Sequence, residues 1–210
     1  MTTETEPSAG AQRLTWVTLL VLATATFAAI PFDYYGMDVS CTDDGCVFAR
    51  TGTLLYWPVA LAVSYAVIAL AYRRAGRTHL RPYLITGAVL TVLFVIAWVI
   101  ARIYFDTNPP VRFGEWVLVL DRLIAPAGII GIGLLVLAGL ERGVALAAFA
   151  IGYLIVVLVP VDFGWQSPGD TRAMFVPQQV INGGLLLLGV AGFALAGRFG
   201  LSARRVEKTL

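Results

Sequence analysis

The chain has 210 residues, of which 59% are hydrophobic and only 13% charged. Soluble globular proteins carry roughly a quarter charged residues, so this composition argues against a soluble enzyme or a nucleic-acid-binding domain and predicts a membrane protein. The formal net charge of +2 excludes nothing by itself, and the distribution of charge along the chain is more informative.

Six apolar runs are each about long enough to cross a bilayer as a helix, because a hydrocarbon core of ~30 Å needs ~20 helical residues. They lie at 14–32, 54–72, 84–105, 116–140, 143–161 and 179–197. We therefore predict an all-α, polytopic membrane helix bundle of about six transmembrane helices. The expected organisation is a disordered tail at 1–12, one membrane domain at 13–200 and a basic cytoplasmic tail at 201–210. No connecting segment is long enough for a soluble domain, so no nucleic-acid partner is expected.

The basic residues are distributed unevenly between the two ends of these runs. With the N-terminus inside, ten of the 15 Lys and Arg residues fall in inner segments and five in the outer half, which is acidic. This is the positive-inside bias, and it predicts a multi-pass protein of the cell membrane with both termini in the cytoplasm. The preference for arginine over lysine is typical of a bacterial genome rich in G and C.

The first run contains Ala23-Thr24-Ala25, which resembles a signal-peptide cleavage site. Its preceding region is only weakly basic, and apolar sequence continues to Ile30. These features favour a retained span over a cleaved signal.

The segment after the first run holds the two cysteines, Cys41 and Cys46, on either side of the turn-forming sequence Thr-Asp-Asp-Gly. On an oxidising outer face this spacing predicts a disulfide that closes a small loop. A metal site that adds Asp38, Asp43 and Asp44 to the thiols would lack further soft ligands. We predict the disulfide and no metal.

The inner segment 72–83 is strongly basic and is interpreted mainly as a topology anchor, with binding of anionic lipid headgroups as the alternative. It also contains His79, the single histidine. With no histidine at the outer face, haem ligation, a histidine–metal site and a Ser-His-Asp triad are excluded there. No cofactor is expected.

Charged residues interrupt the third and fourth runs near their shared outer loop. Arg102 and Asp121 would lie at similar depth if the two runs formed antiparallel helices, so we predict that they pair. Arg122 points ~100° away from Asp121 around the same helix and needs another partner. The candidates are Asp106, Glu115 and Asp162. Further along, Pro126 is expected to kink the fourth helix.

The sixth run opens with Gln178, Gln179 and Asn182, at the depth expected for the Arg102–Asp121 pair. The outer ends of runs three to six therefore converge on one polar cluster. Its members are Arg102, Asp106, Glu115, Asp121, Arg122, Asp162, Gln179 and Asn182. A polar cluster inside a membrane is a functional-site hypothesis by default, and the alternative is a network that only fixes helix register.

The sequence contains no phosphate-binding glycine loop, HExxH, GxSxG or EF-hand pattern. Three hypotheses therefore stay open. The first is a small carrier, or the membrane subunit of one, with a polar, acidic cavity that opens to the extracytoplasmic half. The second is an enzyme that uses Asp121 and Glu115 as general acid and base on a lipid or isoprenoid. The third is a non-catalytic interaction or immunity-type protein.

The three hypotheses require different cavities and different partners. The enzyme needs an apolar cavity beside its carboxyl groups, the carrier needs a route to the cytoplasm, and the interaction protein needs neither. The expected partners are the bilayer, a lipid-like or small polar ligand and a membrane subunit.

Overall fold

The computed structural model describes residues 9–42, 45–74, 80–107, 115–159 and 176–207. Side-chain surroundings are described for 14–36, 52–74, 85–100, 119–120, 122–159 and 176–197. The elements are α1 (Ala9–Tyr35), β1 (Met37–Thr42), β2 (Gly45–Arg50), α2 (Thr51–Arg74), α3 (Leu80–Thr107), α4 (Glu115–Ile124), α5 (Pro126–Glu141), α6 (Val144–Leu158) and α7 (Val176–Glu207).

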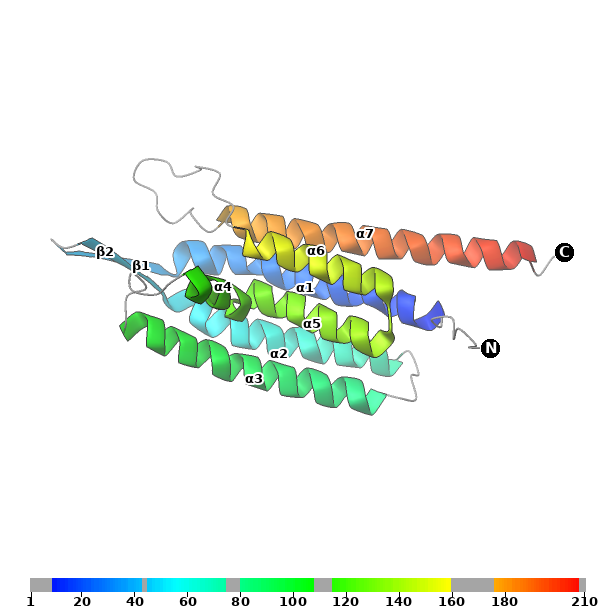
Figure 1. Cartoon of the computed structure of the whole chain (residues 1–210), viewed down its shortest axis with the longest axis horizontal. Helices are drawn as coiled ribbons and strands as arrows, with labels where there is room; N and C mark the ends of the chain where they lie inside the picture. Colours follow the sequence, from blue (N-terminus) through cyan, green and yellow to red (C-terminus); the bar gives the residue numbers. More distant parts are fainter. Residues whose placement is uncertain (1–8, 43–44, 75–79, 108–114, 160–175, 208–210) are drawn as a thin grey trace.

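Most of these helices run side by side as an elongated bundle (Figure 1). The β1–β2 hairpin projects from one end, which we call the outer end. The helix α1 begins and α7 finishes at the opposite end, which we call the inner end. The predicted helical bundle is confirmed.

Three helical segments are long and apolar enough to cross a membrane, as judged from the described residues alone. They are Leu14–Tyr35, Gly52–Arg74 and Val176–Gly197. Shorter apolar stretches occupy Ile85–Ile100, Pro126–Glu141 and Val144–Leu158. The composition and length of these helices indicate a membrane-embedded protein, while the count of six spans stays a prediction.

The helix α1 lies at the centre of the packing, between α7 on one side and α2 on the other. Leu19, Ala23 and Ala29 on α1 are completely buried. The approach of α7 depends on glycine, because a Cβ added at Gly183 would lie 2.8 Å from the ring of Phe27. Small residues bring the two backbones close enough for dispersion contacts, which are the main attraction between helices in lipid.

The connection between α1 and α2 is an antiparallel hairpin, where the sequence analysis expected a small loop closed by the two cysteines. Its base is closed by two glycines: the Gly52 amide donates to the Gly36 carbonyl at 3.2 Å. A Cβ at Gly36 would lie 2.6 Å from the Gly52 Cα. The two residues can therefore be no larger than glycine if the end of α1 and the start of α2 are to meet.

Cys41 pairs directly with Cys46 in the register of this hairpin. Directly opposed residues of antiparallel strands have Cα atoms about 4.5–5.5 Å apart, which falls within the range that a disulfide spans. The side chains of both cysteines lie outside the described set, so the disulfide stays a prediction.

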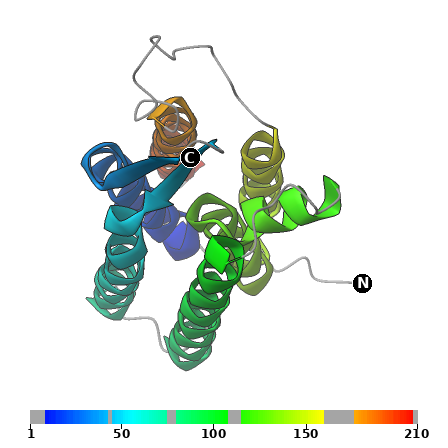
Figure 2. The ribbon, with the colours of Figure 1, turned by 90° about the vertical axis from the view of Figure 1, so that its left-hand side faces the viewer.

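The fourth apolar run differs from the expectation of one kinked helix. It forms two helices, α4 and α5, separated by Ala125 in an extended conformation (φ −58°, ψ 151°). A residue before proline is disfavoured in the helical region, and Pro126 is well suited to the first turn of the new helix. The helix α4 lies across the outer end of the bundle, while the other helices are seen nearly end-on (Figure 2). The run 116–140 therefore does not form a single span.

Candidate functional site

A cavity of about 120 Å³ with several polar side chains in its walls lies towards the outer end of the bundle. Four helices and the start of α5 at the α4–α5 break line it. The lining residues are Thr26 and Asp33 of α1, Thr53 and Trp57 of α2, Trp98 of α3, residues 125–127 at the break, and Gln178, Gln179 and Asn182 of α7. We call this space the outer cavity.

Asp33 is the most unusual residue of the outer cavity, because its carboxyl group is almost completely buried, with the residue 2% exposed. The sequence analysis had left it in the outer loop. In the structure α1 continues through Pro31 to Tyr35 and carries Asp33 into the bundle. Positions 26, 29 and 33 share one helical face, and residues 26 and 29 are also buried. This periodicity was the signal that could have identified Asp33.

The α7 wall supplies carboxamide groups. The Gln178 Nε2 donates to the Asn182 Oδ1 at 3.2 Å, and Asn182 is 3% exposed. The buried Oε1 of Gln179 accepts no hydrogen bond from the described residues. An amide oxygen removed from water in this way is an acceptor still available to a donor or a cation.

The remaining walls add hydroxyl groups and two indole rings. The Thr26 hydroxyl donates to the Leu22 carbonyl at 2.9 Å, and its oxygen can still accept. Trp57 and Trp98 are both buried. Of the described residues around the outer cavity, only Asp33 carries a carboxyl group. Oxygen acceptors, one acidic group and aromatic faces together suit a ligand with a single positive charge.

The break between α4 and α5 borders the outer cavity. Its residues, 125–127, line the outer cavity, and the α5 N-terminus begins there. In membrane transporters the N-terminal ends of discontinuous helices face anionic groups, and exposed carbonyls coordinate cations. Here the Ala125 carbonyl already accepts a hydrogen bond from the Ile129 amide at 3.1 Å. The fold at the break is tight: a Cβ on Gly128 would lie 2.5 Å from the Leu123 carbonyl oxygen.

Arg122 contacts the backbone of a neighbouring helix. Its Nη1 donates to the Leu158 carbonyl at 2.6 Å. A guanidinium group at the last carbonyls of a helix satisfies an orphan acceptor and complements the helix dipole. The partner observed among the described residues is thus the C-terminus of α6, while the side chains of the acidic candidates Asp106, Glu115 and Asp162 lie outside the described set.

The structure describes the side chains of only some of the other predicted site residues. Gln179 and Asn182 do meet in the outer cavity. Arg102 and Asp106 belong to α3, and Glu115 and Asp121 to α4, but their side chains lie outside the described set, as does Asp162 altogether. Their pairing stays a prediction, although the continuous fourth helix that motivated it is absent.

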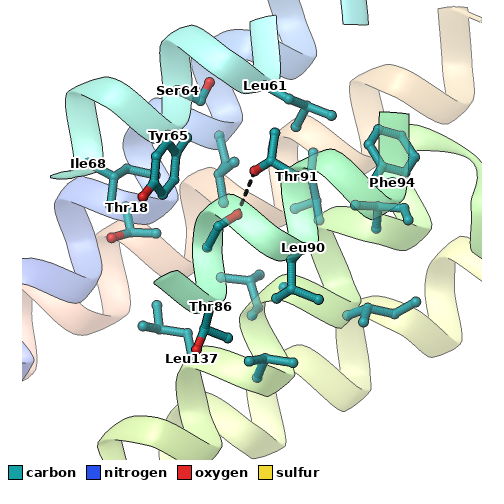
Figure 3. A pocket seen from close by; sticks show the side chains of 18 of the residues that line it. Thr18, Leu61, Ser64, Tyr65, Ile68, Thr86, Leu90, Thr91, Phe94 and Leu137 are labelled. Atoms are coloured by element: carbon teal, nitrogen blue, oxygen red, sulfur yellow. Dashed lines mark hydrogen bonds between the residues drawn. The ribbon is translucent and has the colours of Figure 1, made fainter. Parts of the chain in front are cut away.

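A second and larger cavity, of about 370 Å³, occupies the inner half of the bundle between α1, α2, α3 and α5. We call it the inner cavity. Its walls are mainly aliphatic and aromatic, with Leu61, Leu90, Phe94 and Leu137 among them (Figure 3). The Thr91 hydroxyl donates to the Gly87 carbonyl at 2.8 Å, so it is already bonded to its own helix.

One helical turn of packed side chains separates the two cavities. On each of four helices, a residue that lines one cavity lies three or four positions from a residue that lines the other. The pairs are Leu22 and Thr26 on α1, Leu61 and Trp57 on α2, Phe94 and Trp98 on α3, and Ile130 and Ala127 on α5. We call Leu22, Leu61, Phe94 and Ile130 the septum. All four are buried, and the septum is about 5–6 Å thick at 1.5 Å per residue.

A carboxyl group also lies at the inner end. Glu141 accepts a hydrogen bond from the Tyr72 hydroxyl at 3.0 Å and from the Thr15 hydroxyl at 3.4 Å. These bonds join the ends of α5 and α2 to the start of α1. Arg142 then ends α5 in a left-handed conformation, with φ 52°.

Within the described residues, no three His, Cys, Asp or Glu side chains lie close enough together to hold a metal ion. The chain matches no protein-family model, no curated protein and no solved structure. The candidate site is therefore defined by the outer cavity and its chemistry.

Proposed function

We propose that this chain is a small membrane carrier, or the membrane subunit of one, that binds a small monovalent cation or singly charged amine in the outer cavity. The observation that carries the proposal is the buried Asp33 carboxyl group beside the amides of α7. A charge inside a membrane protein is costly and usually marks an ion or substrate path.

The charge and size of the outer cavity limit the ligand. A single carboxylate neutralises one positive charge, whereas Ca²⁺ sites use several acidic or carbonyl ligands. A volume of about 120 Å³ is far below the ~300–1,000 Å³ of sites for drug-sized molecules. An alkali cation, ammonium or a methylated amine fits both limits, with Trp57 and Trp98 available for cation–π contacts.

The structure also bears on the choice between carrier and enzyme. A general acid–base pair needs two titratable groups beside the reacting bond, and the described lining offers one carboxyl group. A carrier needs a second group that can bind the cation on its way from the outer cavity to the cytoplasm, and the sequence analysis had identified no such group. Glu141 at the inner end is the candidate for this group, and the buried Thr15 hydroxyl of α1 donates to it. The enzyme hypothesis with Asp121 and Glu115 remains the alternative.

In this proposal the chain crosses the cell membrane six times with both termini in the cytoplasm. The helices α5 and α6 have 16 and 15 residues, or about 23 Å of rise, which is short for a ~30 Å core. The helix α5 would form the fourth crossing by itself, because α4 lies across the outer end (Figure 2). Cys41 and Cys46 would be joined as a disulfide on the outer face, as their paired register favours, and Arg102 and Asp121 would pair in the outer wall.

Two threonines on α1 provide a matched test. Thr26 lines the outer cavity, whereas Thr24 lies on the exposed side of α1, and both hydroxyls donate to the carbonyl four residues earlier at 2.9 Å. Thr26→Val and Asp33→Asn should each abolish or strongly weaken binding, while Thr24→Val should not. The probes are Na⁺, ammonium and methylammonium, measured by thermal stabilisation in detergent and by methylammonium uptake into proteoliposomes.

Stabilisation by one of these cations that is lost in Asp33→Asn and Thr26→Val alone would support the proposal. If none of the three cations stabilises the unaltered protein, or if Thr24→Val is as impaired as Thr26→Val, the outer cavity is not the binding site.

A further inference from the structure

The inner cavity has no role in the proposed cation site, because it lies on the far side of the septum and its walls are predominantly apolar. Apolar cavities of this kind do not hold water, and smaller ones bind hydrocarbons readily. A space of about 370 Å³ falls within the size range of ligand sites. Its occupant must therefore be largely hydrocarbon.

The inner cavity reaches the surface of the bundle between α3 and α5. Leu93 lines the cavity and is nevertheless 57% exposed. On the facing side, a Cβ added at Gly133 would meet no atom within 4 Å, so the wall there is open. The outward faces of α2 and α3 carry exposed aliphatic residues such as Val63, Val89 and Val92. In a bilayer, the molecules next to this opening are lipid acyl chains.

Three arginines lie within two residues of positions that line the inner end of the same cavity, together with the carboxyl group of Glu141. Tyr72 on α2 and Leu140 on α5 line the cavity at its inner end. Arg73 and Arg74 follow Tyr72 directly, and Arg142 comes two residues after Leu140. All three arginines are exposed, and the bond between Tyr72 and Glu141 places the two helix ends at the same level.

We propose that the inner cavity is a site for an anionic phospholipid, with one acyl chain inside the bundle and the phosphate group held by Arg73, Arg74 and Arg142. An arginine near the membrane surface attracts anionic headgroups, and its guanidinium group binds phosphate oxygens in a bidentate manner. The acyl chain fills the cavity and packs against the side of α3 that would otherwise make few contacts with the bundle. The arginines give the site a preference for phosphatidylglycerol over phosphatidylcholine.

Two glycines allow a matched test of the acyl-chain position. Gly133 lines the inner cavity, whereas Gly152 is exposed on α6 and away from it, and neither has an atom within 4 Å of an added Cβ. The full-length protein is purified in detergent, and phosphatidylglycerol or phosphatidylcholine of the same chain length is added. Bound lipid is counted by native mass spectrometry, and the shift in unfolding temperature is recorded.

The unaltered protein and Gly152→Phe should retain phosphatidylglycerol, while Gly133→Phe should lose it. The smaller Gly133→Ala and Gly133→Leu should give intermediate losses, so the result does not depend on whether the largest variant folds. Replacing Arg73 and Arg74 together with glutamine should weaken phosphatidylglycerol binding about tenfold or more. Asp33→Asn should bind the lipid normally, which separates this site from the outer cavity.

Equal retention of phosphatidylglycerol by the Gly133 and Gly152 variants would overturn the proposal. Equal binding of the two phospholipids by the unaltered protein would overturn it as well, because the three arginines would then contribute nothing to recognition.

Discussion

The hydrogen bond between Tyr72 and Glu141 offers a quantitative test of how the inner ends of the helices are joined. A bond of 3.0 Å to a carboxylate contributes about 1.5–3 kcal/mol, and the half-buried position of Glu141 places this one near the lower limit. The bond from Thr15 to the same carboxylate is 3.4 Å long, so it should be weaker. We expect coupling energies of about 1.5 kcal/mol for Tyr72–Glu141 and about 0.5 kcal/mol or less for Thr15–Glu141.

Double-mutant cycles measure these two energies separately. The first cycle combines Tyr72→Phe with Glu141→Met, and the second combines Thr15→Val with Glu141→Met. Unfolding free energies come from titration of mixed micelles with a denaturing detergent, followed by circular dichroism. The reasoning fails if the Tyr72 coupling is below about 0.5 kcal/mol, or if the Thr15 coupling is the larger of the two.

Three further predictions concern single packing and hydrogen-bonding features. Tyr153→Phe should stabilise the protein by about 1 kcal/mol, because the buried hydroxyl has no hydrogen-bond partner among the described residues; a lower unfolding temperature would contradict this. Gly128→Ala should destabilise by about 1–3 kcal/mol through its clash with the backbone of α4, while Gly139→Ala, which meets open space, should be neutral or stabilising. Arg122→Met should cost about 1–2 kcal/mol and increase amide exchange at the end of α6, since the last carbonyls lose their cap; unchanged exchange there would argue against capping.

The sequence by itself determined that this is a helical, membrane-embedded chain. That property is local: each apolar run is read from about twenty consecutive residues, and the backbone of such a run must form a helix in lipid. The amides Gln179 and Asn182 were also found from the sequence, since they stand out in an otherwise apolar helix. The sequence also contained the signal for the break before Pro126, because a proline disfavours the helical conformation of the residue that precedes it, here Ala125.

Only the tertiary structure decided which polar groups meet. Asp33 was expected in a loop because the first apolar run ends at residue 32, but packing of α1 against α2 and α7 keeps the helix intact to Tyr35 and buries the carboxyl group. For Arg122 the sequence offered only acidic candidates, and the fold across the outer end brings its guanidinium group to the last carbonyl of α6. Whether two residues share a cavity depends on the rotation and crossing of several helices. Those are set by side-chain packing between segments far apart in the chain.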